Sequence, residues 1–199
     1  MSSVQAIMRA ADFAARKHTQ QRRAGEAAEP YINHLLEVAR LVADATDGNP
    51  DAVVAALLHD VVEDQDVTSA EVAAEFGPTV AAIVAEVTDD KILRKEERKS
   101  RQVASAPYKT KFASIIKLAD KTANLRAIAG SPPSWSAERK VEYVCWAQDV
   151  VAGLPVKPSH LLLKFEAAAD AALARAVSRL KCSTRRFNGW FHGTGLQSH

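Results

Sequence analysis

The sequence predicts an all-α fold, a single helical bundle of about seven to nine helices. Apolar residues recur at helical spacing along nearly the whole chain, and no segment shows the strict alternation of a half-buried strand. Of the 199 residues, 47% are hydrophobic and 25% are charged, which is the balance of an ordinary globular domain. We therefore expect one domain over residues 1–180 and a tail over residues 181–199.

Apolar periodicity predicts helices over residues 4–15, 32–43, 51–62, 68–77, 78–87, 112–128, 136–152 and 159–180. Proline and capping residues set several of their starts. Pro50 and Pro78 each suit the first turn of a helix, where the missing N–H carries no penalty. Thr68 and Glu71 have the spacing of a capping box, in which each side chain bonds the backbone of the other.

Residues 181–199 differ from the rest of the chain in composition. They combine Arg185 and Arg186 with an aromatic cluster of Phe187, Trp190 and Phe191, and they show no hydrophobic period. We expect a tail that is poorly ordered unless it docks on another surface. Contact with nucleic acid is the alternative for this basic and aromatic segment.

Composition limits the classes of protein that the sequence allows. No apolar run approaches the roughly 18 residues of a membrane-spanning helix, so no membrane partner is expected. Two cysteines are too few for a disulfide framework, which favours a reducing, cytoplasmic setting. The net charge of +2 gives no reason to expect a nucleic-acid partner.

The segment around His59 and Asp60 holds a dense group of ionisable side chains. These two residues end an apolar run, and Glu63 and Asp64 follow one turn later. In a continuous helix, His59 would share a face with Glu63, and Asp60 with Asp64. Burying such charges unpaired is costly, and a bound cation would compensate them. A solvated acidic helix end is the alternative.

Two further residues complete a candidate ligand set. His34 opens the second predicted helix, and Asp120 follows an apolar stretch inside a later one. Together with His59 and Asp60 they give two imidazoles and two carboxylates without sulfur. Such a set favours a divalent ion such as Mn²⁺ or Fe²⁺ over a structural zinc.

The order of these residues, H…HD…D on predicted helices, resembles the HD-domain metal-dependent phosphohydrolases. Successive segments resemble motifs of the RelA/SpoT hydrolase domain, most of all the small stand-alone alarmone hydrolases, over roughly residues 4 to 153. These segments are His18-Thr-Gln-Gln-Arg-Arg-Ala-Gly25, Pro30-Tyr-Ile-Asn-His34, Leu57-Leu-His-Asp-Val-Val-Glu-Asp64, Val87-Thr-Asp-Asp-Lys91 and Lys117-Leu-Ala-Asp-Lys-Thr-Ala-Asn-Leu-Arg126.

The resemblance implies an enzyme that hydrolyses the 3′-pyrophosphate of guanosine tetra- and pentaphosphate, (p)ppGpp, to GDP or GTP and pyrophosphate. It also implies Mn²⁺ held by the H…HD…D set, with Glu63 and Asp64 positioning or activating the attacking water. Two positions depart from the family pattern: Ala24 stands where a lysine is usual, and Leu35 stands where a proline is usual.

Cations are needed beside this acidic centre, because the substrate is highly anionic. Arg22 and Arg23 are candidates, and so are Lys91 and Lys95 in a charged run that otherwise suits a solvated helix face. The resemblance favours Lys95. Asn124 lies four residues after Asp120 and therefore faces the same side.

The resemblance also assigns a nucleotide contact to Tyr143, for which a core aromatic is the alternative. The expected substrate-binding residues are therefore Arg23, Lys95, Asn124 and Tyr143.

Two other functions remain open from the sequence. An HD-type phosphatase acting on another nucleotide, such as NADPH, would use the same metal and release orthophosphate. A non-catalytic nucleotide sensor would have a broken ligand set, whereas all four ligands and both following carboxylates are present here.

Overall fold

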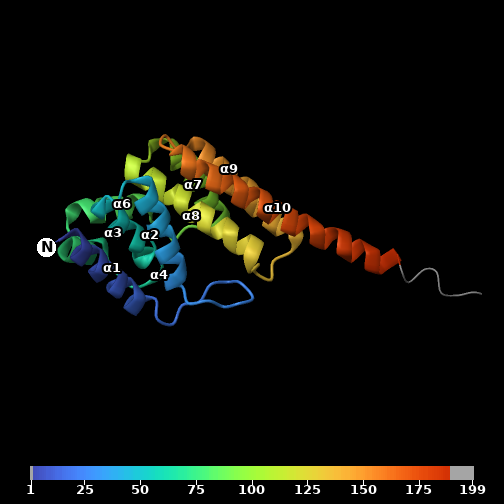
Figure 1. Ribbon diagram of the computed structural model, residues 1–199, viewed down its shortest axis with the longest axis horizontal. Coiled ribbons are helices and arrows are strands. Elements are labelled where there is room, and N and C mark those ends of the chain that lie inside the picture. Colours follow the sequence, from blue (N-terminus) through green and yellow to red (C-terminus); the bar gives the residue numbers. More distant parts are fainter. Residues whose placement is uncertain (1, 189–199) are drawn as a thin grey trace, which may run out of the picture.

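The computed structural model describes residues 2–188, with side chains as far as Ser178. This part of the chain is helical and contains no strand, which confirms the predicted fold class (Figure 1). It has nine α-helices of eight or more residues, the single-turn helix α4 and a 3-10 helix at Ala106–Tyr108. In order, the α-helices are α1 (Ser3–Lys17), α2 (Ile32–Ala45), α3 (Pro50–Leu57), α4 (Val61–Asp64), α5 (Ser69–Phe76), α6 (Pro78–Val87), α7 (Lys95–Ser105), α8 (Lys111–Gly130), α9 (Ala137–Gly153) and α10 (Ser159–Asn188).

The predicted helix starts are confirmed at the local level. The capping box at the start of α5 is formed, with the Thr68 hydroxyl accepting from the Glu71 N–H and the Glu71 carboxylate accepting from the Thr68 N–H. Pro50 and Pro78 occupy the first positions of α3 and α6. Gly77, with a φ of 90°, separates α5 from α6 in a backbone conformation that glycine adopts without strain.

The prediction of a continuous helix over residues 51–62 was wrong. Helix α3 ends at Leu57, a turn spans Leu58 to Asp60, and α4 begins at Val61. The Leu58 N–H bonds the carbonyls of both Val54 and Ala55, which tightens the last turn and ends the helix. The turn separates His59 from the helix that carries Glu63, whereas the Asp64 N–H bonds the Asp60 carbonyl at 2.8 Å, one helical turn apart.

Helix α8 is the centre of the bundle. It packs against α2, α6, α9 and α10, and its middle third is buried on every side. A helix with no solvated face is normally apolar throughout. In α8, however, Lys117, Asp120 and Lys121 are all buried among apolar residues. These buried charges mark where the core holds polar side chains that need partners.

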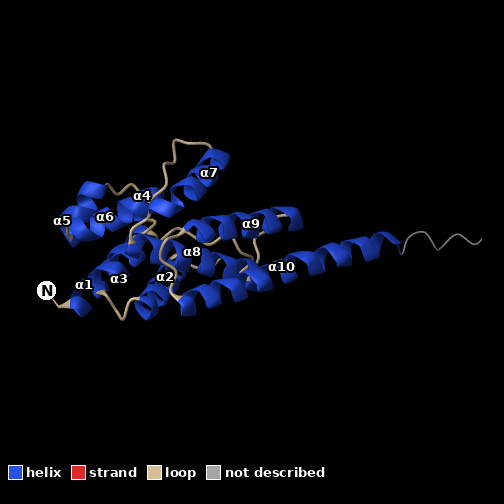
Figure 2. Ribbon diagram, turned by 90° about the horizontal axis from the view of Figure 1, so that it is seen from above, coloured by secondary structure: helices blue, strands red, loops and turns tan. Residues whose placement is uncertain are grey.

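Helices α7 and α10 lie on different sides of the molecule. In the view of Figure 2, α9 and α8 lie between α7 and α10, and α10 projects beyond the helices on which it packs. The prediction ended this last helix at Leu180, whereas it continues to Asn188. The rest of the predicted tail, residues 189–199, lies outside the described residues. Among the helices of the described part, none is long and apolar enough to cross a membrane.

The central place of α8 predicts a large loss of stability on truncating its core side chains. Leu118 is fully buried, so Leu118→Ala should lower the free energy of unfolding by about 2–5 kcal/mol, measured by urea denaturation. Leu163 on α10 is 65% exposed, and Leu163→Ala is the matched control, expected within about 0.5 kcal/mol of the parent. Equal effects of the two substitutions would contradict the central position of α8.

Candidate metal centre

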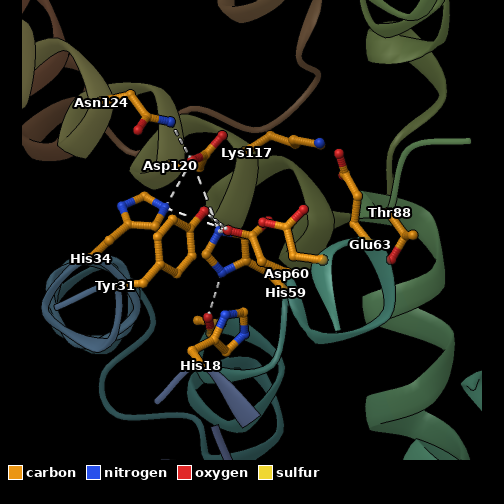
Figure 3. A network of polar contacts seen from close by, with 12 residues as sticks. His18, Tyr31, His34, His59, Asp60, Glu63, Thr88, Lys117, Asp120 and Asn124 are labelled. Carbon is orange, nitrogen blue, oxygen red and sulfur yellow. Dashed lines mark hydrogen bonds and ion pairs between the residues drawn. The ribbon is translucent and has the colours of Figure 1, made fainter. Parts of the chain in front are cut away.

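Three side chains that are distant in sequence meet inside the bundle. His34, His59 and Asp120 each present a ligand atom within 4.8 Å of the others (Figure 3). The His34 Nε2 lies 3.3 Å from Asp120 Oδ1, and the His59 Nε2 lies 3.9 Å from the same oxygen. All three residues are at most 8% exposed. The structure thus brings together three of the four residues predicted as metal ligands.

The fourth predicted ligand, Asp60, borders this group. Its Oδ2 lies 3.2 Å from His59 Nε2 and 3.7 Å from His34 Nε2. The same oxygen accepts a 2.6 Å hydrogen bond from the Tyr31 hydroxyl. Sequence reasoning did not identify Tyr31 as a partner of Asp60. The feature of the sequence that could have indicated it is the position of Tyr31, three residues before His34 in the Pro-Tyr-Ile-Asn-His segment.

Each ligand residue is placed by a different local structure. His34 is in the first turn of α2, and Asp120 is in the middle of α8. His59 and Asp60 occupy the turn between α3 and α4. In a continuous helix, two consecutive residues point about 100° apart. Because a turn interrupts the helix here, both residues can approach the centre.

The imidazole of His59 is oriented for a metal ion. Its Nδ1 lies 2.7 Å from the carbonyl oxygen of Ala56. A carbonyl only accepts, so Nδ1 carries a hydrogen and Nε2 faces the other three residues. That Nε2 is buried and has no hydrogen-bond partner among the described residues. A ring nitrogen fixed in this way is the usual arrangement in metal-binding histidines, and the residues therefore fit a metal ion.

The electrostatics of the centre favour positive charge. Burial alone would lower the pKa of His59, but the charges of Asp60 and Asp120 outweigh it and raise that pKa to about 10. Burial would likewise raise the pKa of Asp60, yet His59 holds it well below its usual range. For His34, burial is the largest effect, and it lowers the pKa, so this ring stays neutral and able to coordinate.

Asp120 is held at both oxygens by residues of its own helix. The Asn124 amide donates to Oδ1 at 2.6 Å, and the Lys121 ammonium donates to Oδ2 at 3.0 Å. Lys121 is itself buried, and its Nζ lies 4.4 Å from the ring centre of Trp146 on α9. Oδ1 is therefore the oxygen that faces the two histidines, while Oδ2 faces a cation.

The two predicted catalytic carboxylates lie on α4, next to the centre. Glu63 is mostly buried and accepts from the Asp89 N–H at 3.2 Å. Burial, followed by the charges of Asp89 and Asp60, raises the pKa of Glu63 to about 7. Asp64 instead accepts from the Gln21 amide at 2.8 Å and from Lys91 at 2.6 Å. Glu63 is therefore the carboxylate better suited to exchange a proton near neutral pH.

A cavity of about 200 Å³ adjoins the centre, between α7 and α9. Its walls combine cations with aromatic rings: Lys95, Arg98, Lys99, Arg139, Trp135, Tyr143 and Trp146, together with Asp89 and Gln102. Two contacts join the cavity to the centre. Tyr143 lies near Asn124, which holds Asp120, and the backbone of Asp89 holds Glu63. The cavity thus suits an anionic ligand with an aromatic ring.

The predicted binding residues surround the centre without all touching it. Lys95 and Tyr143 line the cavity. Arg23 donates to the Asn124 amide oxygen at 3.0 Å, whereas Arg22 turns away and bonds the Thr19 and Gln21 carbonyls. Of the two arginines that the sequence offered as cations, Arg23, the one expected to bind substrate, is therefore the one that contacts the residues around the centre.

Sequence reasoning missed most of the cavity wall. Arg98, Lys99, Arg139, Trp135 and Trp146 all line it without having been singled out. Cations lie over both tryptophan rings: Arg139 is 4.3 Å from the ring centre of Trp135, and Lys99 is 5.1 Å from that of Trp146. Trp135 and Arg139 stand four residues apart, a spacing that the sequence shows. The pair of Lys99 and Trp146 joins α7 to α9, and the sequence does not show it.

An all-helical bundle with a buried H…HD…D cluster defines a class of protein, and a family model confirms it. The model for the HD domain matches residues 10–148, which include all four predicted ligands. The chain belongs to the HD-domain family.

Individual relatives narrow this class. The chain is 52% identical over 151 residues to the human guanosine-3′,5′-bis(diphosphate) 3′-pyrophosphohydrolase MESH1, and the alignment covers 74% of this chain and 84% of the relative. The Drosophila melanogaster MESH1 is 42% identical over 162 residues, or 80% and 90% of the two chains. A solved structure of a metazoan orthologue of SpoT that hydrolyses ppGpp matches with a TM-score of 0.79 and 41% identity, covering 82% of this chain and 93% of that one.

Family membership and the donor set together imply a divalent metal ion at this centre. His34, His59 and Asp120 supply two nitrogens and a carboxylate oxygen in a buried position. A mixed nitrogen and oxygen set of this kind suits a first-row divalent ion that keeps open positions for water or substrate.

The raised pKa of Glu63 predicts a dependence of stability on pH in the metal-free protein. The pKa of Glu63 rises from its usual 4.5 to about 7 on folding, so the folded state binds this proton more tightly than the unfolded state. The stabilisation from the bound proton is fully present below pH 4.5 and is lost as the pH rises through 7. Glu63→Gln has no proton to lose, so above pH 7 it should be more stable than the parent by up to roughly 3 kcal/mol, at about 1.4 kcal/mol per pKa unit.

Urea denaturation of both proteins at intervals from pH 4 to pH 8 measures this difference. Other titrating groups, including His34, cancel in the comparison. A difference that stays constant across this range would show that Glu63 ionises normally.

Proposed function

We propose that this protein is a Mn²⁺-dependent (p)ppGpp 3′-pyrophosphohydrolase, which converts the alarmone to GDP or GTP and pyrophosphate. The observation that carries the proposal is the buried cluster of two histidines and two carboxylates beside a basic and aromatic cavity. The activity named for the MESH1 relatives, at up to 52% identity over most of both chains, supports the same reaction.

His34, His59, Asp60 and Asp120 would hold the ion. Their imidazole and carboxylate donors are those that Mn²⁺ accepts, and the set lacks the thiolates of structural zinc sites. When bound, such an ion lowers the pKa of water and polarises a phosphoryl oxygen. Tyr31, Asn124 and Lys121 orient the two carboxylates by the hydrogen bonds described above.

Glu63 is the residue we assign to proton transfer. The water oxygen forms a bond to the phosphorus attached to the ribose 3′-oxygen, and that P–O bond breaks, releasing pyrophosphate. The 3′-oxygen leaves as the hydroxyl of GDP or GTP, with a proton taken from solvent. Glu63 accepts the proton that the water loses, for which a pKa of about 7 is well matched. Asp64 helps to position the water, while its bonds to Gln21 and Lys91 fix its own orientation.

The cavity and Arg23 are assigned to substrate binding. Lys95 presents an ammonium group to the cavity, where it would neutralise phosphate charge. Tyr143 offers a ring against which a purine can stack, close to Asn124. Arg23 donates to the Asn124 amide oxygen and would contact a phosphate near the metal centre.

The proposed reaction has a direct test. Metal-stripped protein is incubated with ppGpp, with and without Mn²⁺, and the products are identified. We expect GDP and pyrophosphate only when Mn²⁺ is present. His59→Ala and Asp60→Ala should abolish turnover while the helical circular dichroism spectrum remains. Release of orthophosphate, or turnover of NADPH in place of ppGpp, would favour the phosphatase alternative, and full activity of either variant would refute the ligand assignment.

The two neighbouring arginines provide a matched pair for substrate binding. Arg23→Ala should raise the KM for ppGpp roughly tenfold, because a charge-assisted hydrogen bond is lost. Arg22→Ala should leave KM within about twofold, because Arg22 bonds only backbone carbonyls of its own loop. Steady-state kinetics measures both, and an unchanged KM in Arg23→Ala would remove Arg23 from the binding site.

A further inference from the structure

Glu63 is held at both of its carboxylate oxygens. The Asp89 N–H donates to Oε2 at 3.2 Å, and the Arg98 Nη1 donates to Oε1 at 3.5 Å. Asp89 lies in the segment between α6 and α7, and Arg98 lies on α7. A carboxylate on α4 is therefore oriented by groups from a different part of the fold. The sequence assigned no role to either group.

The same arginine also faces the cavity. Arg98 lines it together with Lys95 and Lys99, one turn apart on the same helix. Its Nε is buried and has no hydrogen-bond partner among residues 2–188. A guanidinium has five N–H donors in a planar fork, so contact with Glu63 leaves donors for an anion on the cavity side.

The contact with Glu63 is also one that a ligand can influence. At 3.5 Å it is longer than a strong charge-assisted hydrogen bond, which lies near 2.7–2.9 Å. A phosphate group in the cavity would accept from the same guanidinium, and would fix its position. Arg98 is thus placed between the anion that the cavity suits and the carboxylate that activates water.

We propose that Arg98 is a positioning residue for Glu63, and that it ties the orientation of this carboxylate to a phosphate group bound in the cavity. This inference rests on the proposed function, because it takes Glu63 as the proton acceptor. It predicts that Arg98 affects turnover through Glu63, and substrate affinity through its contact with phosphate.

The first test compares Arg98→Met, Arg98→Lys and Arg101→Met in ppGpp hydrolysis with saturating Mn²⁺. Arg101 is an exposed residue of the same helix that does not line this cavity, so it is the matched control. Arg98→Met should lower kcat roughly tenfold or more and raise KM roughly tenfold. Arg98→Lys should recover part of the KM but little of kcat, since an ammonium lacks the fork. Arg101→Met should match the parent.

A double-mutant cycle with Glu63→Gln separates positioning from general structural damage. If Arg98 acts through Glu63, Arg98→Met should lower kcat little further in the Glu63→Gln background, while its effect on KM persists. Independent, additive losses of kcat would overturn the inference. Wild-type release of pyrophosphate is measured alongside, so failure of the proposed function is recognised separately.

The pH profile of kcat gives a second, independent measurement if Glu63→Gln is too slow to assay. The charged groups that face Glu63 are Asp60 from the α3–α4 turn, Asp89 before α7, Lys117 from α8 and Arg98 itself. Removing the Arg98 cation should shift the ascending limb to higher pH in Arg98→Met, but not in Arg101→Met. An ascending limb that stays at the parent position would contradict a contact between Arg98 and Glu63.

Discussion

The structure depends on one constraint: two carboxylates and two imidazoles are buried together in a helical core. Each ionised group taken from water must find partners, and an unpaired one would cost several kcal/mol. Much of the surrounding sequence meets this requirement. The Tyr31 hydroxyl, the Asn124 amide and the Lys121 ammonium each bond one of the two carboxylates, and the Ala56 carbonyl fixes one imidazole. Few of these residues could be replaced without leaving a buried charged or polar group unpaired.

The same constraint explains the unusual central helix. Helix α8 is surrounded by other helices, yet it carries three charged residues within five positions. Lys117 and Lys121 lie one turn apart and flank Asp120, so two cations accompany one anion through the core. Their positive charge balances the acidic residues that α4 and the segment before α7 bring to the same place. Apolar packing therefore surrounds these charges, and the balance between cations and carboxylates stabilises the charges themselves.

The sequence predicted the fold class and three converging ligands, because both depend on local patterns. Apolar periodicity predicts helices directly, and the order of His34, His59 and Asp120 matches a family motif. The break before Val61 was not predictable in the same way, because only His59 and Asp60 interrupt the apolar residues there and no glycine or proline marks it.

The residues of α7 show a different limit of sequence reasoning. This helix has no buried residue, so its charged run carries no apolar period that would distinguish one cation from another. Only the packing of α7 against α9 decides that Arg98 reaches Glu63 while Arg101 remains exposed. The hydroxyl of Tyr31 was missed for a similar reason, since its bond to Asp60 joins residues 29 positions apart.

Lys121 connects the two halves of the site. Its ammonium group contacts an oxygen of Asp120 on one side and the indole of Trp146, a wall of the cavity, on the other. An ion beside Asp120 and a ligand against Trp146 would therefore act on the same charge, and their two binding equilibria would be thermodynamically linked. Because such coupling is reciprocal, each occupant would change the affinity of the other by the same factor.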